Sequence, residues 1–160
     1  EACSKVSLRG FKVPENVYKL EKAQTELAKE LEEAIQSGNI IEASMLHKEL
    51  KDAEEKSEQI KKIAKQLLKE IGIKVNLLGF KYWQTALALV IEDEGKIVMM
   101  SLYCSVAKKH RTTAAKVERA MRYAYMDLNL KQIFKTDYPI NNKALLFLLI
   151  DRIMNKIDNT

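Results

Sequence analysis

The sequence predicts an all-α fold: an antiparallel helical hairpin followed by a helical domain that contains a helix-turn-helix. Composition supports this, because the 160 residues include only five glycines and two prolines and are rich in Ala, Leu, Lys and Glu, which favour helices. Periodicity also supports it, since apolar residues recur at spacings of three and four along most of the chain. A Ser-Gly-Asn interruption at residues 37–39 divides the first periodic stretch into two arms.

Charge divides the chain into two parts. The net charge is +5, yet residues 1–56 carry 9 basic and 12 acidic side chains, a net of −3, whereas residues 57–160 carry 18 basic and 10 acidic ones, a net of +8. We therefore expect a tail with the hairpin at 1–56 and a helical domain at 57–160. The basic balance of the second part favours an anionic partner.

The hairpin is predicted from two narrow apolar stripes on charged helices. A helical pattern opens at Pro14, and its inner stripe comprises Val17, Leu20, Ala23, Leu27, Leu31 and Ala34. Gly38 suits a left-handed helix cap. The inner side of the returning arm is expected to hold Ile41, Met45, Leu46 or Leu50, and Ala53. Such a hairpin is either a spacer or a docking or dimerising module, and the small area of its stripe favours the second interpretation.

Two further elements are predicted before the helix-turn-helix. Helical spacing resumes at Glu58 and runs to Gly72, either as a continuation of the second arm or as a new helix. IKVNLLGFKYW, residues 73–83, is β-branched and aromatic, so it is a short strand or an extended connector, with Gly79 marking a turn. The apolar stretch 81–93 predicts a buried helix.

A helix-turn-helix is predicted over residues 101–126. A short helix ends in Lys108 and Lys109, a break follows, and Thr112 or Thr113 can cap a second helix at about 113–126. The inner sides of the two helices are expected to hold Leu102, Val106, Ala107, Val117, Ala120, Met121 and Ala124.

The outer face of this motif is cationic. Between Lys108 and Arg122 there are six Lys or Arg residues and one acid, Glu118. Lysines and a capped helix N-terminus can neutralise phosphates, and Arg119 or Arg122 can make bidentate contacts to guanine. Glu118 either accepts from cytosine N4 or forms an internal ion pair. The pattern favours a second helix that enters a DNA major groove; the alternative is an amphipathic surface helix.

VAKKHRTTAAKVERAMRYA, residues 106–124, resembles the helix-turn-helix of the C-terminal effector domain of the sporulation master response regulator, stage-zero sporulation protein A. The similarity covers about residues 60–154 and includes EIGIKVNLLGFKYW. It implies a domain of about six helices that binds a short promoter element. The family's contacting positions fall on Lys108, Thr113, Lys116, Glu118, Arg119 and Arg122; with Lys109, Arg111 and Tyr123 they complete the expected DNA-binding set.

Four positions in this region depart from the family's common residues. Arg111 replaces Asn, Ala115 replaces Ser, Lys116 replaces Arg and Tyr123 replaces His. Lys in place of Arg exchanges a forked donor for a point charge. We therefore expect DNA binding to persist and the preferred DNA site to differ.

The last part of the chain is expected to be a polar connector at 129–143, containing Pro139, and a closing helix at 145–157. The apolar face of this helix comprises Leu145, Leu146, Leu148, Leu149 and Ile153. Core packing explains these residues without DNA, and in the resembled family the last helix also helps to arrange tandem protomers.

Residues 2–56 resemble a different family. They look like the end of the first ATPase module and the middle, UVR-like coiled-coil hairpin of C-type Clp unfoldases, most clearly in AIQSGNIIEASMLHKELKDAE, residues 34–54. In that family the hairpin docks adaptor proteins or sister hairpins. The Walker motif G-x-x-x-x-G-K-[ST] does not occur in the sequence, which excludes ATP hydrolysis by that route.

Together these features predict a cytoplasmic, sequence-specific DNA-binding transcription regulator and not an enzyme. Its expected partners are double-stranded DNA, the sigma subunit of RNA polymerase, and a second copy or a protein partner bound through the hairpin. The alternative is a non-enzymatic adaptor that binds a Clp unfoldase or its partners through the hairpin and carries a vestigial DNA-binding domain.

Other chemistry is not expected from the sequence. His47 and His110 have no ligand-spaced partners, and Cys3 and Cys104 match no metal or disulfide pattern, so we expect no cofactor and no metal. No apolar run approaches membrane-spanning length.

Overall fold

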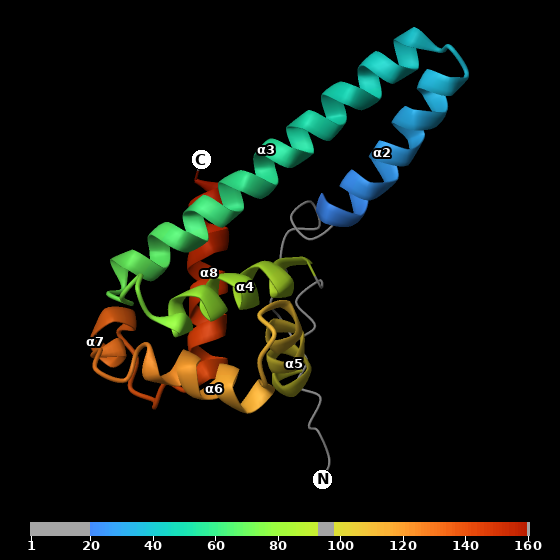
Figure 1. Cartoon of the computed structure of the whole chain (residues 1–160). Helices are drawn as coiled ribbons and strands as arrows, with labels where there is room; N and C mark the ends of the chain where they lie inside the picture. The colour runs from blue at the N-terminus through green and yellow to red at the C-terminus, as the bar shows by residue number, and fades with distance from the viewer. Residues whose placement is uncertain (1–19, 93–97, 160) are drawn as a thin grey trace.

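The computed structural model describes residues 20–92 and 98–159, and within them the chain forms seven α-helices and no β-strand (Figure 1). Helices α2 (Leu20–Gln36) and α3 (Ile40–Glu70) form an antiparallel hairpin. The other helices are α4 (Leu78–Glu92), α5 (Met99–Lys109), α6 (Ala114–Tyr123), α7 (Leu130–Phe134) and α8 (Asn142–Asp158). The predicted all-α fold is confirmed. The expected helix start at Pro14 and the stripe residue Val17 lie outside the described residues.

The turn between α2 and α3 has the chemistry that the sequence indicates. Gly38 adopts a left-handed conformation with φ of +72°, which glycine reaches without steric cost. Asn39 caps α3, because its side-chain oxygen accepts from the N–H of Glu42 at 3.3 Å and its amide donates to the Glu42 carboxylate at 2.6 Å. The predicted break is therefore the end of one helix and the start of the next.

The inner stripe of the hairpin differs in part from the prediction. Ile41 and Met45, which we expected inside, are 77 % and 62 % exposed, so that prediction is wrong. The direction of the inner face is set by Ile60, which is buried further along α3. Counting back from Ile60 in steps of three and four residues places Ala53, Leu50, Leu46 and Ala43 inside, and leaves Ile41 and Met45 outside. The buried or half-buried stripe residues are Leu27, Leu31, Ala34, Ala43, Leu46, Leu50 and Ala53.

Helix α3 joins the hairpin to the domain without interruption. It has 31 residues, which corresponds to a length of about 46 Å. The residues after Glu58 therefore continue the second arm, and the expected boundary between 56 and 57 falls inside this helix. Its second half buries Ile60, Ala64, Leu67 and Leu68. The hairpin thus extends from the domain on a continuous helix, in a direction fixed by that burial.

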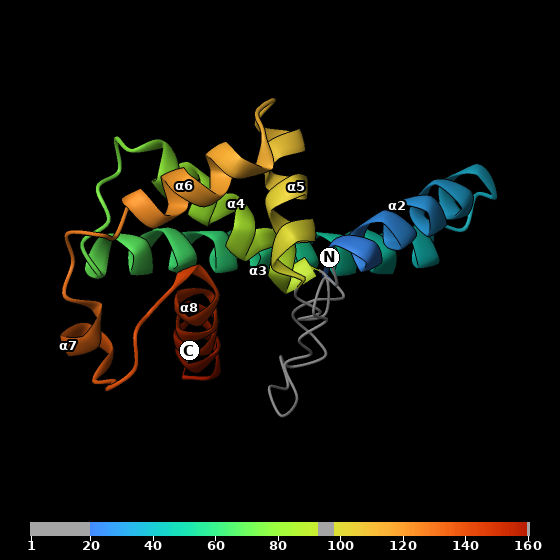
Figure 2. The same ribbon diagram turned by 90° about the horizontal axis from the view of Figure 1, so that it is seen from below.

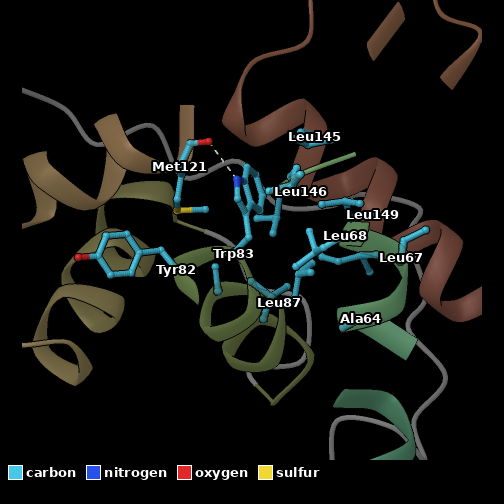
Figure 3. Packing of buried hydrophobic residues seen from close by; sticks show 14 of the residues in the cluster. Ala64, Leu67, Leu68, Tyr82, Trp83, Leu87, Met121, Leu145, Leu146 and Leu149 are labelled. Atoms are coloured by element: carbon cyan, nitrogen blue, oxygen red, sulfur yellow. Dashed lines mark hydrogen bonds between the residues drawn. The ribbon is translucent and has the colours of Figure 1, made fainter. Parts of the chain in front are cut away.

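A hydrophobic core forms where α3, α4, α6 and α8 meet (Figure 3). Trp83 of α4 is fully buried at its centre, and its indole N–H donates to the carbonyl oxygen of Met121 at 3.0 Å. Burying an apolar side chain of this kind stabilises the fold by about 1.5–3 kcal/mol. The other fully buried residues labelled around it include Leu67, Leu68, Leu87, Leu145, Leu146 and Leu149.

Two predictions about connectors are wrong. Gly79 lies inside the first turn of α4 rather than at a turn, because its missing side chain serves a helix–helix contact described below. The stretch 129–143, expected to be a polar connector, contains α7. Asn129 caps this short helix and Leu130 is buried, so one cap and one apolar contact outweigh the polar composition.

Candidate DNA-binding surface

Helices α5 and α6 form the predicted helix-turn-helix. Leu102, Val106 and Ala107 are buried on the inner side of α5, as expected. The chain then turns over residues 110–113 and enters α6, which packs on both α4 and α5 (Figure 2). Helix α6 ends at Tyr123, three residues before the expected end of the recognition helix.

The turn between the two helices is closed by backbone contacts and a side-chain cap. The N–H of Thr112 donates to the carbonyl oxygen of Ala107 at 2.9 Å, and Arg111 takes a left-handed φ of +52°. The hydroxyl of Thr113 accepts from the N–H of Lys116 at 3.4 Å, so Thr113 is the cap. The positive end of the α6 dipole therefore lies at the end of α5 that carries the lysines.

A close approach of α4 supports α6 from its inner side. A Cβ placed at Gly79 would collide with the carbonyl oxygen of Ala120 and lie 2.7 Å from the Cβ of Ala124. Only glycine lets the two helices come this close. Trp83 donates to the carbonyl oxygen of Met121, which is one of the last four in α6 and lacks a partner within the helix. The position of α6 is thus fixed by packing and by a buried hydrogen bond.

A buried polar cluster joins α5, α6 and α8. Asn142, the first residue of α8, donates to the hydroxyl oxygen of Tyr103 at 2.9 Å and to the backbone carbonyl of Glu118 at 3.2 Å. Its side-chain oxygen accepts from the hydroxyl of Tyr125 at 2.8 Å. Burial raises the pKa of Tyr125 to about 12 and also raises the pKa of Tyr103. The cluster is therefore neutral and hydrogen-bonded, which favours one orientation of α6.

Eight of the expected contact residues share one exposed surface. Arg119 is at its centre, because with about 3.6 residues per turn it lies opposite the buried Val117 and Met121. We call this the basic surface, and its residues, all exposed, are Lys108, Lys109, Arg111, Thr113, Lys116, Arg119, Arg122 and Tyr123.

The comparison with protein families agrees with this geometry. Residues 63–132 match the family model described as the C terminal of the sporulation initiation factor Spo0A. This segment is similar to the C-terminal part of that factor. It contains the end of α3, all of α4, α5 and α6, and the start of α7. No solved structure matches the chain. The match supports the resemblance of this region to a DNA-binding domain of the sporulation transcription regulators.

One expected contact residue, Glu118, lies at the edge of the basic surface and is less exposed than the others. Glu118 is half-buried, and its carboxylate forms an ion pair with the guanidinium of Arg122 at 3.2 Å. The internal ion pair that the sequence suggests for Glu118 is present, and the contact with cytosine stays a prediction. Among the described residues Arg119 has no ion-pair partner, so its guanidinium fork is accessible for a ligand.

Sequence reasoning missed several residues that position the basic surface. His110 anchors the end of α5 to α4: its Nε2 lies 2.7 Å from the hydroxyl of Thr85, and its ring packs edge-on against Tyr82 at 4.9 Å between centroids. The Thr85 hydroxyl also lies 3.1 Å from the Lys81 carbonyl oxygen, to which it can donate. A threonine four residues after Lys81 in an apolar helix gave no separate signal.

Other kinds of site find little support. Within residues 20–92 and 98–159, no group of His, Cys, Asp and Glu could hold a metal ion. Across the same residues, every helix is too short or too polar to cross a membrane. Cys104 is a free, exposed thiol on α5, His47 is exposed on α3, and Cys3 lies outside the described residues.

Proposed function

We propose that this protein is a sequence-specific transcription regulator whose helix α6 enters the major groove of promoter DNA. The observation that carries the proposal is a row of exposed cations on a helix that is buried and hydrogen-bonded on its other side. A major groove admits one α-helix, and six cations suit the phosphates on either side of it. Rigid support for α6 is what base reading requires, because a mobile helix cannot hold donors against a base edge.

We assign base reading mainly to Arg119. It is at the centre of the exposed face, and its fork matches the O6 and N7 atoms of guanine. Lys108, Lys109 and Arg111 lie at the end of α5 and in the turn, where they would contact phosphates and fix the register. Glu118 would hold Arg122 through their ion pair, which leaves the other N–H groups of that guanidinium for DNA.

The adaptor function remains the second candidate. Its support is the apolar surface at the end of the hairpin, which is more exposed than a spacer requires. A vestigial DNA-binding domain, however, need not keep six cations on one face or a buried cluster that orients α6. We therefore prefer the regulator. A contact with the sigma subunit of RNA polymerase stays a prediction from the family resemblance.

Selection of binding sites from random duplexes, at physiological salt and with the full chain, tests the proposal. We expect one short motif to be enriched. Arg119→Ala should then cost about 1–3 kcal/mol of binding free energy on that motif and much less on unrelated duplexes, because it removes a base contact. Arg119→Lys separates the fork from the charge and should lose most of the same discrimination.

Lys108→Ala is the matched control, since it removes one exposed cation outside α6. It should weaken binding about equally on all duplexes and lower the slope of log affinity against log salt by about one. Binding without an enriched motif, abolished by salt, would contradict sequence-specific regulation and leave phosphate contact alone. Equal weakening of all duplexes by Arg119→Ala would remove Arg119 from the base-reading role.

A further inference from the structure

The tip of the hairpin is an exposed surface that is both apolar and acidic. We define the hairpin tip as residues 32–45. Its large apolar side chains lie in solvent: Ile35, Ile40, Ile41 and Met45 are 63 %, 81 %, 77 % and 62 % exposed. The same residues include Glu32, Glu33 and Glu42 and no Lys or Arg. Clustered exposed apolar residues with a charged rim mark an interaction surface.

The structure restricts where a partner of the tip can be. Helix α3 runs unbroken from the turn at Gly38 into the core, and it carries the tip away from α6 in both views of the molecule (Figures 1 and 2). The length of α3 prevents the tip from folding back onto the basic surface of the same chain. The tip is therefore accessible to the surface of a second molecule.

The basic surface of a second copy has the complementary chemistry. The described hairpin residues 24–56 contain 4 basic and 9 acidic side chains, a net of −5. Residues 108–122 contain six basic side chains and one acid, a net of +5. The end of the basic surface also presents apolar area, since Tyr123 and Met126 are each 61 % exposed. Both the charges and the apolar contacts of the tip find a match there.

We propose that the hairpin tip binds the basic surface of a second copy of this chain, head to tail, and competes there with DNA. The proposal rests on the proposed function insofar as the basic surface is the DNA-binding one. Pairing of two tips would bring six carboxylates together, three from each copy, and is disfavoured. The contact should weaken with salt, as attraction between exposed charges does.

Two charge-reversal variants of the full chain test the contact without DNA. Glu32→Lys with Glu33→Lys changes the tip at exposed positions of α2, and Arg119→Glu changes the basic surface. We expect the wild type to self-associate at low salt in sedimentation velocity, and each variant alone to associate more weakly by about tenfold or more. An equimolar mixture should regain association, because one variant supplies an intact tip and the other an intact basic surface.

Glu54→Lys with Glu55→Lys is the control for net charge. It makes the same charge change at exposed positions of α3 outside the tip, and association should stay close to wild type. Association of Arg119→Glu alone at wild-type strength would overturn the proposal, since the tip would then bind something other than the basic surface. A mixture that stays monomeric, or a wild type that is monomeric at low salt, would overturn it as well.

The two proposals fail in different experiments. The mixing experiment contains no DNA, so loss of sequence-specific binding in the duplex selection leaves its result unchanged. A wild type that selects a motif but never self-associates contradicts the head-to-tail contact alone. Where both hold, added duplex should dissociate the wild-type complex. At low salt the apparent DNA affinity of the wild type should fall as protein concentration rises, because self-association covers the basic surface. The Glu32→Lys, Glu33→Lys variant should show no such fall.

Discussion

The hairpin and the domain are both helical, yet they bury their apolar residues to very different extents. In the domain, Trp83, Leu87 and Met121 have no exposed surface. Among the described side chains of the hairpin, the most buried are the alanines Ala34 and Ala53, while the larger leucines of the stripe are only half-buried. The domain therefore stabilises itself through packing, whereas the hairpin depends on its connection through α3.

Helix α3 contains both a buried and an exposed apolar segment. Its second half places four apolar residues in the core, and its first half places Ile40, Ile41 and Met45 in solvent. Exposed β-branched and thioether side chains add nothing to the stability of an isolated hairpin. The difference indicates that the apolar residues of the domain stabilise its fold, whereas those of the tip are available for an intermolecular contact.

Removing one large side chain from each region should have the largest and most unequal effects on stability. Trp83→Ala is expected to lower the free energy of unfolding by about 3–5 kcal/mol, because it leaves a cavity and an unsatisfied carbonyl. Met45→Ala should change it by less than about 0.5 kcal/mol. Urea unfolding followed by far-UV circular dichroism suits both variants, since Trp83 is the only tryptophan. A large loss with Met45→Ala would show that the tip is packed within the molecule.

Two glycines, one in each region, should have smaller effects of different kinds. Gly79→Ala should cost about 1–3 kcal/mol, because the new methyl group separates α4 from α6, and it should also weaken DNA binding by moving α6. Gly38→Ala meets no atom within 4 Å but forces alanine to a positive φ, which costs about 1–2 kcal/mol. DNA binding of Gly38→Ala should equal the wild type. Thermal unfolding and a duplex titration distinguish the two, and equal DNA affinities would contradict the role of Gly79.

The Asn142 cluster gives the domain a pH dependence at alkaline pH. The folded-state pKa of Tyr125 is raised to about 12, chiefly by burial, above the ordinary value of about 10. The stability that comes from keeping this hydroxyl neutral is therefore complete below the unfolded pKa and is lost as pH rises through the folded one. Tyr125→Phe should lower stability near neutrality by about 0.5–1.5 kcal/mol and flatten the alkaline limb. An unchanged limb, measured by urea midpoints against pH, would contradict this.

The sequence predicts the helices and the cationic face well because both depend on local periodicity. Spacing in threes and fours is enough to turn Val117 and Met121 inward and Arg119 outward, and a threonine before an apolar run is enough to indicate a cap. Local spacing also placed Ile41 and Met45 inside. That prediction was wrong because local spacing does not include the distant Ile60, whose burial sets which side of the continuous helix faces inward.

Contacts between distant elements could not be predicted from spacing. Gly79 was interpreted as a turn because glycine commonly marks one, and only the approach of Ala120 from another helix shows its role. Asn142 likewise looks like part of a polar connector, and its partners come from three other segments of the chain. Residues that support a site from beneath carry little sequence signal, because their function depends on what packs against them.

The smallest predicted effect concerns Arg111, where stability and DNA affinity should change in opposite directions. Its φ of +52° is a conformation that Asn tolerates better than Arg, so Arg111→Asn should stabilise the domain by about 0.5–1 kcal/mol. The same change removes one exposed cation from the basic surface, which should weaken binding to all duplexes and lower the salt slope by about one. Lys109→Asn removes a neighbouring cation from a helical position and should weaken binding without the gain in stability. Thermal unfolding and salt titrations of both variants measure the two effects, and a destabilised Arg111→Asn would show that the arginine side chain has contacts that outweigh its backbone strain.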